Sequence, residues 1–304
     1  MKQVLVAMSM VAAMGVQAQQ CQPQGEDCIE VGQWQFAVAV GAGVMTNPLE
    51  GGDNIPLFIL PYFSYYGDNF FVENTTVGYT FSHQRDFDLS FIVEPNVEQA
   101  FFERHHLRSI VAPEKYLDVN GMVVDNLPEA VPPTSDEDNP TKTPSYKPKI
   151  SIDEITSRDW TIDGGLLLHW YINDTSKLSA SWLYDLGGVY KGQHATLTYS
   201  QQLPLPIEAN AKLQLKVGAQ WQSQQLVDYY YGLRTTDSSD PRLYYQGRSS
   251  LSPFASIAYN HRINKHWQLK FNIKHTWLAD GISDSPLVTS SGSSSIFIGG
   301  LYEF

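Results

Sequence analysis

The chain has few basic residues, two cysteines and no long apolar run after its first 18 residues, and each shortage excludes a class of protein. A membrane-spanning helix needs about 18 or more consecutive apolar residues, so such a helix is not expected. Lys and Arg number 20 against 32 Asp and Glu, a net charge of −12. A nucleic-acid partner requires a basic surface, which this composition does not offer. The sequence also lacks a glycine-rich phosphate-binding loop. A chain of this kind that enters a membrane must cross it with strands.

The only cysteines are Cys21 and Cys28, seven positions apart. An oxidising compartment allows them to form a disulfide that closes a small loop. Two sulfurs without a neighbouring histidine pattern do not make a zinc site. We therefore expect a possible disulfide here and no metal or cofactor.

Residues 1–18 have the features of a secretory signal peptide. Lys2 precedes the apolar run Val4–Val16, and cleavage is expected after Ala18. Residues 19–32 then form a periplasmic N-terminal segment. Loss of one lysine leaves 19 basic and 32 acidic residues, so the mature charge is −13 instead of −12.

Apolar and polar residues alternate repeatedly from residue 33 onward, with one apolar face and one polar face per segment. The clearest segments are 160–170, 194–200, 212–222 and 266–277. The longer ones have about ten to twelve residues, the length of a tilted strand that crosses a bilayer, whereas strands of soluble sandwiches average about five or six. The chain also has 17 Tyr, 7 Trp and 14 Phe, and aromatic girdles at both membrane interfaces are one use for them.

The final stretch, residues 296–304, is apolar and aromatic and ends in Phe304. A barrel pairs such a strand with its first strand and so removes an aggregation-prone edge. The stretch resembles the terminal signal of Gram-negative outer-membrane barrels, with Gly299, Tyr302 and Phe304 at the usual offsets. Phe297 departs from that signal, which usually has a polar residue there. The resemblance implies recognition by the outer-membrane barrel assembly machinery.

The connections predict the fold and its orientation. Segments 173–176, 204–210 and 263–265 are short and are assigned to periplasmic turns, while 224–250 and 279–294 are long and are assigned to the outside. In the first third, segments 55–66, 70–72, 76–83 and 87–94 fit this alternation only if the short segment at Phe70 is a separate strand. We therefore predict an all-β, antiparallel transmembrane β-barrel over residues 33–304 with about 12 strands, or 10 as the fallback, located in the outer membrane as a monomer among outer-membrane lipids.

Residues 112–159 interrupt the strand pattern. This stretch holds seven of the 17 prolines and the acidic run Asp136-Glu137-Asp138, a composition typical of a long loop. Strand parity places it outside the cell. It is interpreted as a lid, a surface contact or a solvated insertion.

Four lysines are predicted to face the lumen: Lys212, Lys216, Lys270 and Lys274. They could line an anion-attracting pore, or form an internal network with Asp163 and Asp185, which are predicted to lie inward or near the rim. His275 falls on the lipid-facing register, where a lipid-hydrolysing site would need it, but an interfacial histidine is far commoner. We assign no catalytic residue.

Several short motifs, in order and spacing, resemble the MipA/OmpV family of outer-membrane proteins, also called MltA-interacting proteins. They are Gly41-Ala42-Gly43, Pro61-Tyr62-Phe63-Ser64-Tyr65, Phe70-Phe71, Gly78-Tyr79, Asp163-Gly164-Gly165, Tyr230-Tyr231-Gly232-Leu233 and Asp284-Ser285-Pro286-Leu287-Val288. The similarity extends over nearly the whole mature chain. The 112–159 insertion and the Cys21/Cys28 extension depart from the family pattern.

The resemblance implies a non-enzymatic scaffold that links a periplasmic lytic transglycosylase with a murein synthase. Other members of the family look like surface antigens or adhesins, and a shared barrel does not decide between such tasks. The alternatives are therefore a narrow channel for small solutes and a surface adhesin acting through residues 112–159.

Overall fold

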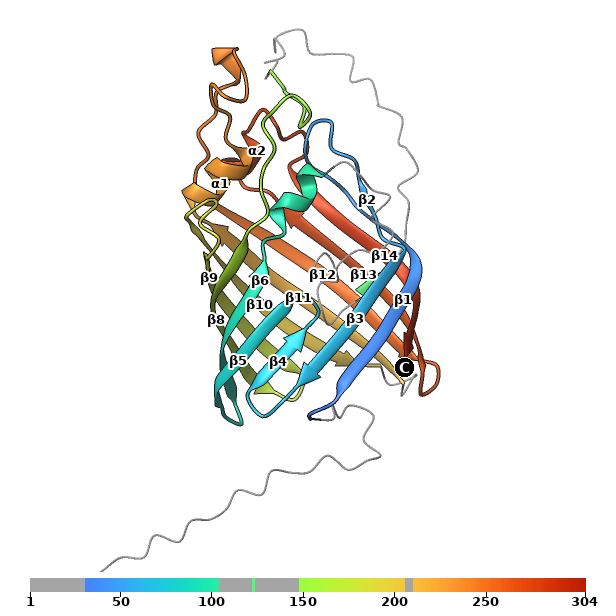
Figure 1. Cartoon of the computed structure of the whole chain (residues 1–304). Coiled ribbons are helices and arrows are strands. Elements are labelled where there is room, and N and C mark those ends of the chain that lie inside the picture. The colour runs from blue at the N-terminus through green and yellow to red at the C-terminus, as the bar shows by residue number, and fades with distance from the viewer. Residues whose placement is uncertain (1–30, 104–121, 124–147, 206–209) are drawn as a thin grey trace, which may run out of the picture.

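The computed structural model describes residues 31–103, 122–123, 148–205 and 210–304, and twelve of its strands close into one antiparallel barrel (Figure 1). In order around the barrel they are β1 (Trp34–Met45), β3 (Ile59–Tyr66), β4 (Phe70–Glu73), β5 (Thr76–His83), β6 (Phe87–Pro95), β8 (Ile162–Asn173), β9 (Ser176–Asp185), β10 (Gln193–Pro204), β11 (Ala211–Gln222), β12 (Ser250–Arg262), β13 (Trp267–Trp277) and β14 (Gly292–Glu303). The first and last strands pair, with Gly41 opposite Gly299. The predicted twelve strands, including the short strand at Phe70, are confirmed.

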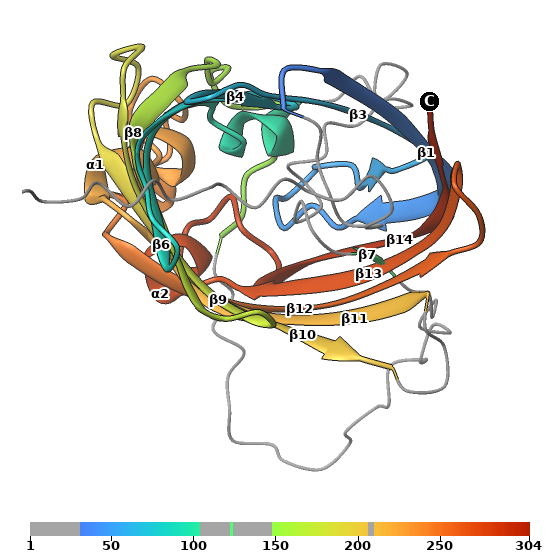
Figure 2. The same ribbon diagram turned by 90° about the horizontal axis from the view of Figure 1, so that it is seen from below.

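Two further strands of two residues each accompany the barrel. β2 (Ile55–Pro56) pairs with the end of β1. β7 (Met122–Val123) belongs to the stretch 112–159 and pairs in parallel with Asn272. Because β12 and β14 already occupy both edges of β13 at Asn272, β7 lies against the face of the sheet. Figure 2 shows it beside β13.

Alternation along each strand separates a lumen face from a lipid face. Val217 and Leu197 are 54% and 52% exposed on the outside, while Lys216 and Ser256 are 6% and 5% exposed on the inside. A band of exposed apolar side chains around a barrel matches the surface that faces lipid in outer-membrane barrels. Among the described residues, no helix is long and apolar enough to cross a membrane, a finding that does not concern strands.

Exposed aromatic side chains gather near both ends of the lipid face, as aromatic girdles do. Trp34, Trp170 and Trp267 lie at one end, and Trp160, Trp182 and Trp277 lie at the other. The indole N–H groups of two of these rings donate hydrogen bonds. The Trp182 indole donates to Gln193 at 3.0 Å, and the Trp160 indole donates to Glu103 at 2.8 Å.

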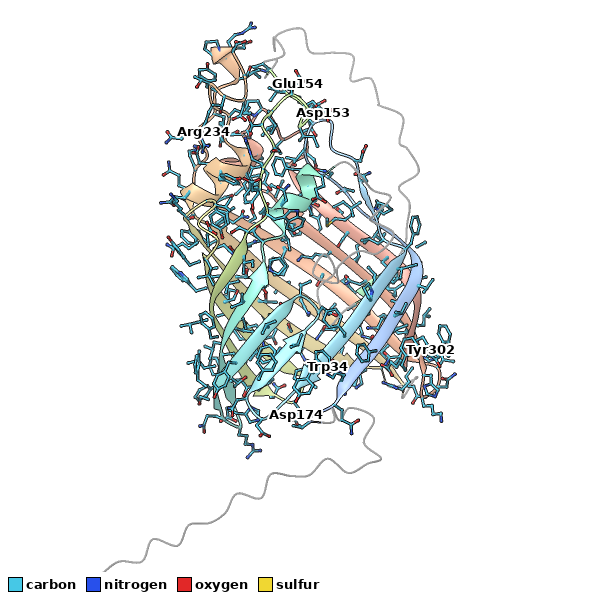
Figure 3. The ribbon with its side chains drawn as sticks, viewed as in Figure 1. Trp34, Asp153, Glu154, Asp174, Arg234 and Tyr302 are labelled. Atoms are coloured by element: carbon cyan, nitrogen blue, oxygen red, sulfur yellow. The ribbon has the colours of Figure 1, made fainter. Side chains whose placement is uncertain are left out.

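The two ends of the barrel differ. The turn end carries the C-terminus and the tight turns 173–176 and 262–267; Trp34, Asp174 and Tyr302 lie there (Figure 3). The loop end carries the short helices η1 (Glu98–Phe102), α1 (Gln224–Tyr231), η4 (Pro241–Leu243) and α2 (Asp280–Ser283), together with residues 148–161. Asp153, Glu154 and Arg234 lie at this end (Figure 3).

Candidate functional site

A packed apolar core lies at the loop end. Its buried members are Leu49, Ile150, Ile152, Tyr190, Leu226, Val227, Tyr230, Tyr231, Leu233, Leu243, Ile282, Leu287 and Val288. They come from α1, α2 and five connecting segments, so these connections pack into one body. Ile150 and Ile152 lie in the stretch 112–159, and the described end of that stretch is therefore packed against the barrel.

Helix α1 supplies the centre of this core. The Ser223 side chain caps its N-terminus by accepting from the Leu226 amide. Leu226, Val227, Tyr230 and Tyr231 then recur at helical spacing and are all buried. Residues 224–250 were expected to form a long outer connection, and this helix within them was not predicted.

A buried ion pair ties two of the connections together. Arg158 Nη1 lies 3.1 Å from Asp237 Oδ1, and the two side chains are 6% and 1% exposed. Arg158 also donates to the Gly232 carbonyl at 3.0 Å. Burial alone would raise the pKa of Asp237, but the bond from Arg158 and the amides of Arg234 and Thr156 lower it overall.

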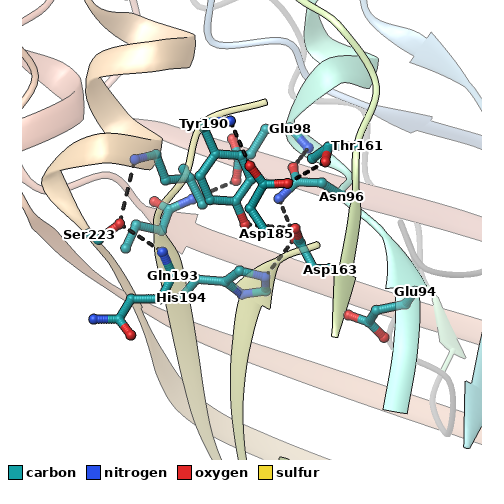
Figure 4. Close-up of polar contacts among 12 residues, drawn as sticks. Glu94, Asn96, Glu98, Thr161, Asp163, Asp185, Tyr190, Gln193, His194 and Ser223 are labelled. Atoms are coloured by element: carbon teal, nitrogen blue, oxygen red, sulfur yellow. Dashed lines mark hydrogen bonds and ion pairs between the residues drawn. The ribbon is translucent and has the colours of Figure 1, made fainter. Parts of the chain in front are cut away.

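Beneath this core lies a network centred on the Asp163 carboxylate (Figure 4). Asp163 is 1% exposed and accepts from the Asn96 amide at 2.6 Å and the Tyr190 hydroxyl at 2.7 Å. His194 Nε2 lies 2.9 Å from the same carboxylate. His194 Nδ1 is buried and has no hydrogen-bond partner among the described residues. Three strands or their ends, β6, β8 and β10, are thereby joined.

Asp185 organises the neighbouring loop 186–192. Its carboxylate accepts from the Thr161 hydroxyl at 2.5 Å and from the amides of Gly188, Tyr190 and Lys191 at 2.9, 2.7 and 2.7 Å. A carboxylate with this many donors is a structural anchor. Asp163 and Asp185 were expected to lie inward or near the rim, and both are buried in the structure.

Glu98 on η1 lies near the Asp163 network. It is 7% exposed and accepts from the Gln222 amide at 2.6 Å and from the Tyr231 hydroxyl. Burial raises the pKa of Glu98 by more than the Tyr231 bond, the charge of His194 and the Gln222 bond lower it. Glu98 was not singled out from the sequence, because its partners lie 124 and 133 positions away.

Glu98 also borders a cavity of about 110 Å³ in the lumen below α2. Its polar lining residues are Glu98, Gln220, Gln222, Ser252, Lys274, Thr276, Ser293 and Ser295, and its apolar lining residues are Met45, Pro48, Val97, Phe101, Leu278 and Ile282. Polar and apolar groups converging on one concavity are typical of small-molecule sites. We take this cavity and the network beside it as the candidate site.

The four predicted lumen lysines lie on β11 and β13, and their side chains have different neighbours. Lys274 lines the cavity. Lys216 is buried. Lys270 Nζ lies 5.0 Å from the centre of the Tyr62 ring, and Lys212 shares the face of Lys216. The structure does not bring the four lysines together at one site.

The residues of the predicted assembly signal lie on or just after β14. Gly299 pairs with Gly41 on β1. The Tyr302 ring makes edge contacts with Trp267 and Phe304, each with centroids 5.1 Å apart. Their role in assembly stays a prediction. Ala18, Cys21 and Cys28 lie outside the described residues, as do residues 112–121 and 124–147 of the predicted outer loop.

His275 lies on the lipid-facing register, as its position predicts. Its Nδ1 is 2.7 Å from Ser294 Oγ across the β13–β14 pair, and its ring makes an edge contact with Trp277 at 4.6 Å. Within the described part of the chain, no carboxylate bonds to the remaining ring nitrogen. No group of residues able to hold a metal ion occurs among the described residues.

A family model that matches almost the entire barrel identifies the family of this chain. The model of the family described as MltA-interacting protein MipA matches residues 38–304. The chain belongs to the MipA family. The expected family membership and outer-membrane location are thus confirmed, and the closed barrel agrees with both.

Relatives within and around the MipA family show how far the similarity extends. The MltA-interacting protein of Escherichia coli (strain K12) is 30% identical over 89 residues, which are 29% of this chain and 36% of that protein. The chain thus matches little more than a third of that relative's length. The "Putative outer membrane protein YiaT" of Escherichia coli (strain K12) is 21% identical over 283 residues, or 89% of this chain and 91% of that protein.

Solved structures of outer-membrane barrels are also similar to this MipA-family chain. A FadL homologue of Pseudomonas aeruginosa has a TM-score of 0.35 at 9% identity and covers 89% of this chain and 87% of its own. The toluene transporter TodX of Pseudomonas putida has a TM-score of 0.37 at 9% identity, with 90% of each chain covered.

Proposed function

We propose that this MipA-family barrel is a non-enzymatic scaffold of the outer membrane that binds a periplasmic murein-degrading enzyme at its turn end. The observation that carries the proposal is the packing of the loop-end connections into one buried core, together with the Arg158–Asp237 pair. A loop end built from packed side chains suits a binding protein better than an open pore. The name of the Escherichia coli relative, MltA-interacting protein, supports the same kind of partner.

The turn end offers a firm surface for such a partner. In turn 173–176, Asn173 Oδ1 accepts from the amide and the hydroxyl of Thr175 at 2.9 Å each. In turn 262–267, Asn264 Oδ1 accepts from the amides of His266 and Trp267 at 2.9 and 3.0 Å. Turns held by their own side chains lose little conformational entropy on binding, which favours complex formation.

Photo-crosslinking in intact cells tests the proposal. A photoreactive amino acid is placed at Asp174 or Lys265 on the turn end and, as matched controls, at Asp153 or Arg234 on the loop end. We expect the two turn-end positions to crosslink a lytic transglycosylase or a murein synthase and the two loop-end positions to crosslink neither. Crosslinks to murein enzymes from the loop end alone contradict the proposal.

The narrow channel is the second candidate, because Lys216 and Lys270 lie on the lumen face. The channel becomes the preferred function if two results are obtained. The turn-end positions must crosslink no murein enzyme, and the purified barrel must conduct ions in a planar bilayer with a current that falls on Lys270→Glu. The adhesin alternative depends on residues 112–159, most of which lie outside the described residues, and it stays a prediction.

A further inference from the structure

The short helix η1 lies between the cavity and helix α1. Val97, Glu98 and Phe101, at the start of η1 and within it, line the cavity. On the α1 side, the Phe102 ring packs against the Tyr231 ring, with centroids 6.1 Å apart. Helix η1 therefore forms one wall of the cavity, and a movement of η1 away from α1 widens the cavity.

Glu98 is the polar contact that joins η1 to its neighbours. The Tyr231 hydroxyl on α1 donates to one carboxyl oxygen, and the Gln222 amide at the end of β11 donates to the other at 2.6 Å. The backbone amide of Glu98 donates to Asn96 Oδ1 at 2.9 Å, and the Asn96 side chain donates to Asp163 at 2.6 Å. The protonation state of one carboxyl group thus acts on η1, α1 and the barrel wall together.

The charges around Glu98 do not all favour its anion. His194 attracts a negative charge on Glu98, while Asp163 repels it. His194 Nε2 already lies 2.9 Å from the Asp163 carboxylate. The titratable or charged side chains around Glu98 are Tyr230 and Tyr231 on α1, His194 on β10, Asp163 on β8, Asp185 at the end of β9, Tyr190 in the loop 186–192 and Lys274 across the cavity on β13. Ionisation of Glu98 adds a negative charge near Asp163 in a buried region, where salt screens little.

The sign of the pH effect follows from the burial of Glu98. Burial raises the pKa of Glu98 in the packed arrangement above its ordinary value of 4.5. A Glu98 side chain that is exposed to water ionises near the ordinary value. The packed arrangement is therefore most stable at low pH, and it loses free energy as the pH rises through the raised pKa.

We propose that η1 and α1 form a pH-sensitive contact, in which ionisation of Glu98 loosens η1 from α1 and widens the cavity at the loop end. The change is local, because β10 and β11 are each paired on both sides and stay in the barrel. The contact is independent of the scaffold role proposed above, which concerns the opposite end of the barrel.

Hydrogen–deuterium exchange of the full-length barrel in detergent micelles tests this contact. The natural protein and Glu98→Gln are compared at the same pH, so the pH dependence of the exchange chemistry cancels. We expect the amides of η1 and α1 to exchange at similar rates in the two proteins at pH 5. At pH 8 they should exchange at least about threefold faster in the natural protein, because ionisation shifts the local opening equilibrium.

The strands β10 and β11 are the internal reference and should exchange equally in both proteins at each pH. Glu154→Gln removes an exposed carboxylate at the loop end and is the matched control; it should follow the natural protein. Heat-modifiable migration on gels verifies that each variant is folded. The ratio of η1 exchange to β10 exchange in the natural protein, which requires no variant, should also rise between pH 5 and pH 8.

Three results would overturn the proposal. In the first, η1 and α1 exchange equally in the natural protein and Glu98→Gln at pH 8. In the second, the strands β10 and β11 gain exchange in parallel with η1 as the pH rises, which means that the opening is not local. In the third, Glu154→Gln slows the exchange of η1 at pH 8 as much as Glu98→Gln does.

Discussion

At the level of single residues, burial and neighbouring groups act on the charge of Glu98 in opposite directions. Burial favours its neutral form, while Tyr231, His194 and Gln222 favour its anion. Burial has the larger effect, so the pKa is raised from its ordinary value of 4.5. A carboxyl group of this kind stabilises the fold most when it is protonated.

The raised pKa of Glu98 predicts a pH dependence of stability. The stabilisation is fully present below about pH 4.5 and is lost as the pH rises through the raised pKa of the folded state. Glu98→Gln has no such loss. The unfolding temperature of Glu98→Gln, relative to that of the natural protein, should therefore rise between pH 5 and pH 8. Heat-modifiable gel migration measures the unfolding temperature of each protein.

All other ionisable groups are the same in the natural protein and in Glu98→Gln, so the difference between the two proteins isolates Glu98. Glu154→Gln, at the exposed tip of the loop end (Figure 3), should follow the natural protein at every pH. If the unfolding temperatures of the natural protein and Glu98→Gln change in parallel with pH, the charge of Glu98 does not affect stability.

The sequence predicts which single residues face inward but not which of them meet. Period-two alternation puts Asp163 on the lumen side of its strand, and the structure agrees. Its bonds to Asn96 and His194 cross 67 and 31 positions of sequence. Such contacts depend on strand register, which alternation alone does not specify.

At the level of elements, the long strands were predictable and the loop-end helices were not. Residues 266–277 alternate clearly, and β13 extends over Trp267–Trp277. Helix α1 has eight residues, too few for a stable isolated helix, so its stability comes from packing. Ser223 followed by Leu226, Val227, Tyr230 and Tyr231 is a capped helical pattern that the sequence does contain.

The pairing of β1 with β14 depends on glycine at a close approach. A Cβ atom added at Gly41 would lie 2.0 Å from the Ile298 carbonyl oxygen, which belongs to the backbone and cannot move aside. Gly41→Ala should therefore destabilise the closed barrel by about 1–3 kcal/mol. The measurements are the unfolding temperature and the rate of proteolysis of the assembled barrel. The first should fall and the second should rise.

Gly300→Ala is the control on the neighbouring strand. There the nearest atoms to an added Cβ belong to the Trp267 side chain, at 3.1 Å, which can shift toward lipid. It should change stability by much less. Equal losses for the two variants would argue against a special role for the backbone contact at Gly41.

At the level of the whole molecule, the two ends of the barrel are chemically different. The loop end is a packed body of helices and connections, and the turn end consists of tight turns and the C-terminus. We infer that the turn end faces the periplasm, because outer-membrane barrels have short periplasmic turns and longer outer loops. The alternation of short and long connections gives the same orientation from sequence alone.

Cysteine labelling tests this orientation. In a background of Cys21→Ala and Cys28→Ala, Ser239→Cys at the loop end should react with a membrane-impermeant maleimide on intact cells. Asp174→Cys at the turn end should react only after the outer membrane is permeabilised. The reverse pattern would place the loop end in the periplasm and remove the structural basis of the proposed partner site.

The pairing of β1 with β14 also determines the order of events during assembly. These strands come from opposite ends of the chain, so their contact closes the largest loop in the molecule and carries the greatest loop-closure entropy. β1 is synthesised first, and it cannot pair with β14 until that last strand has been synthesised. Until then two unpaired edges are exposed to other chains. Closure is thus the final step of folding, and a nascent barrel of this kind requires protection until the step is complete.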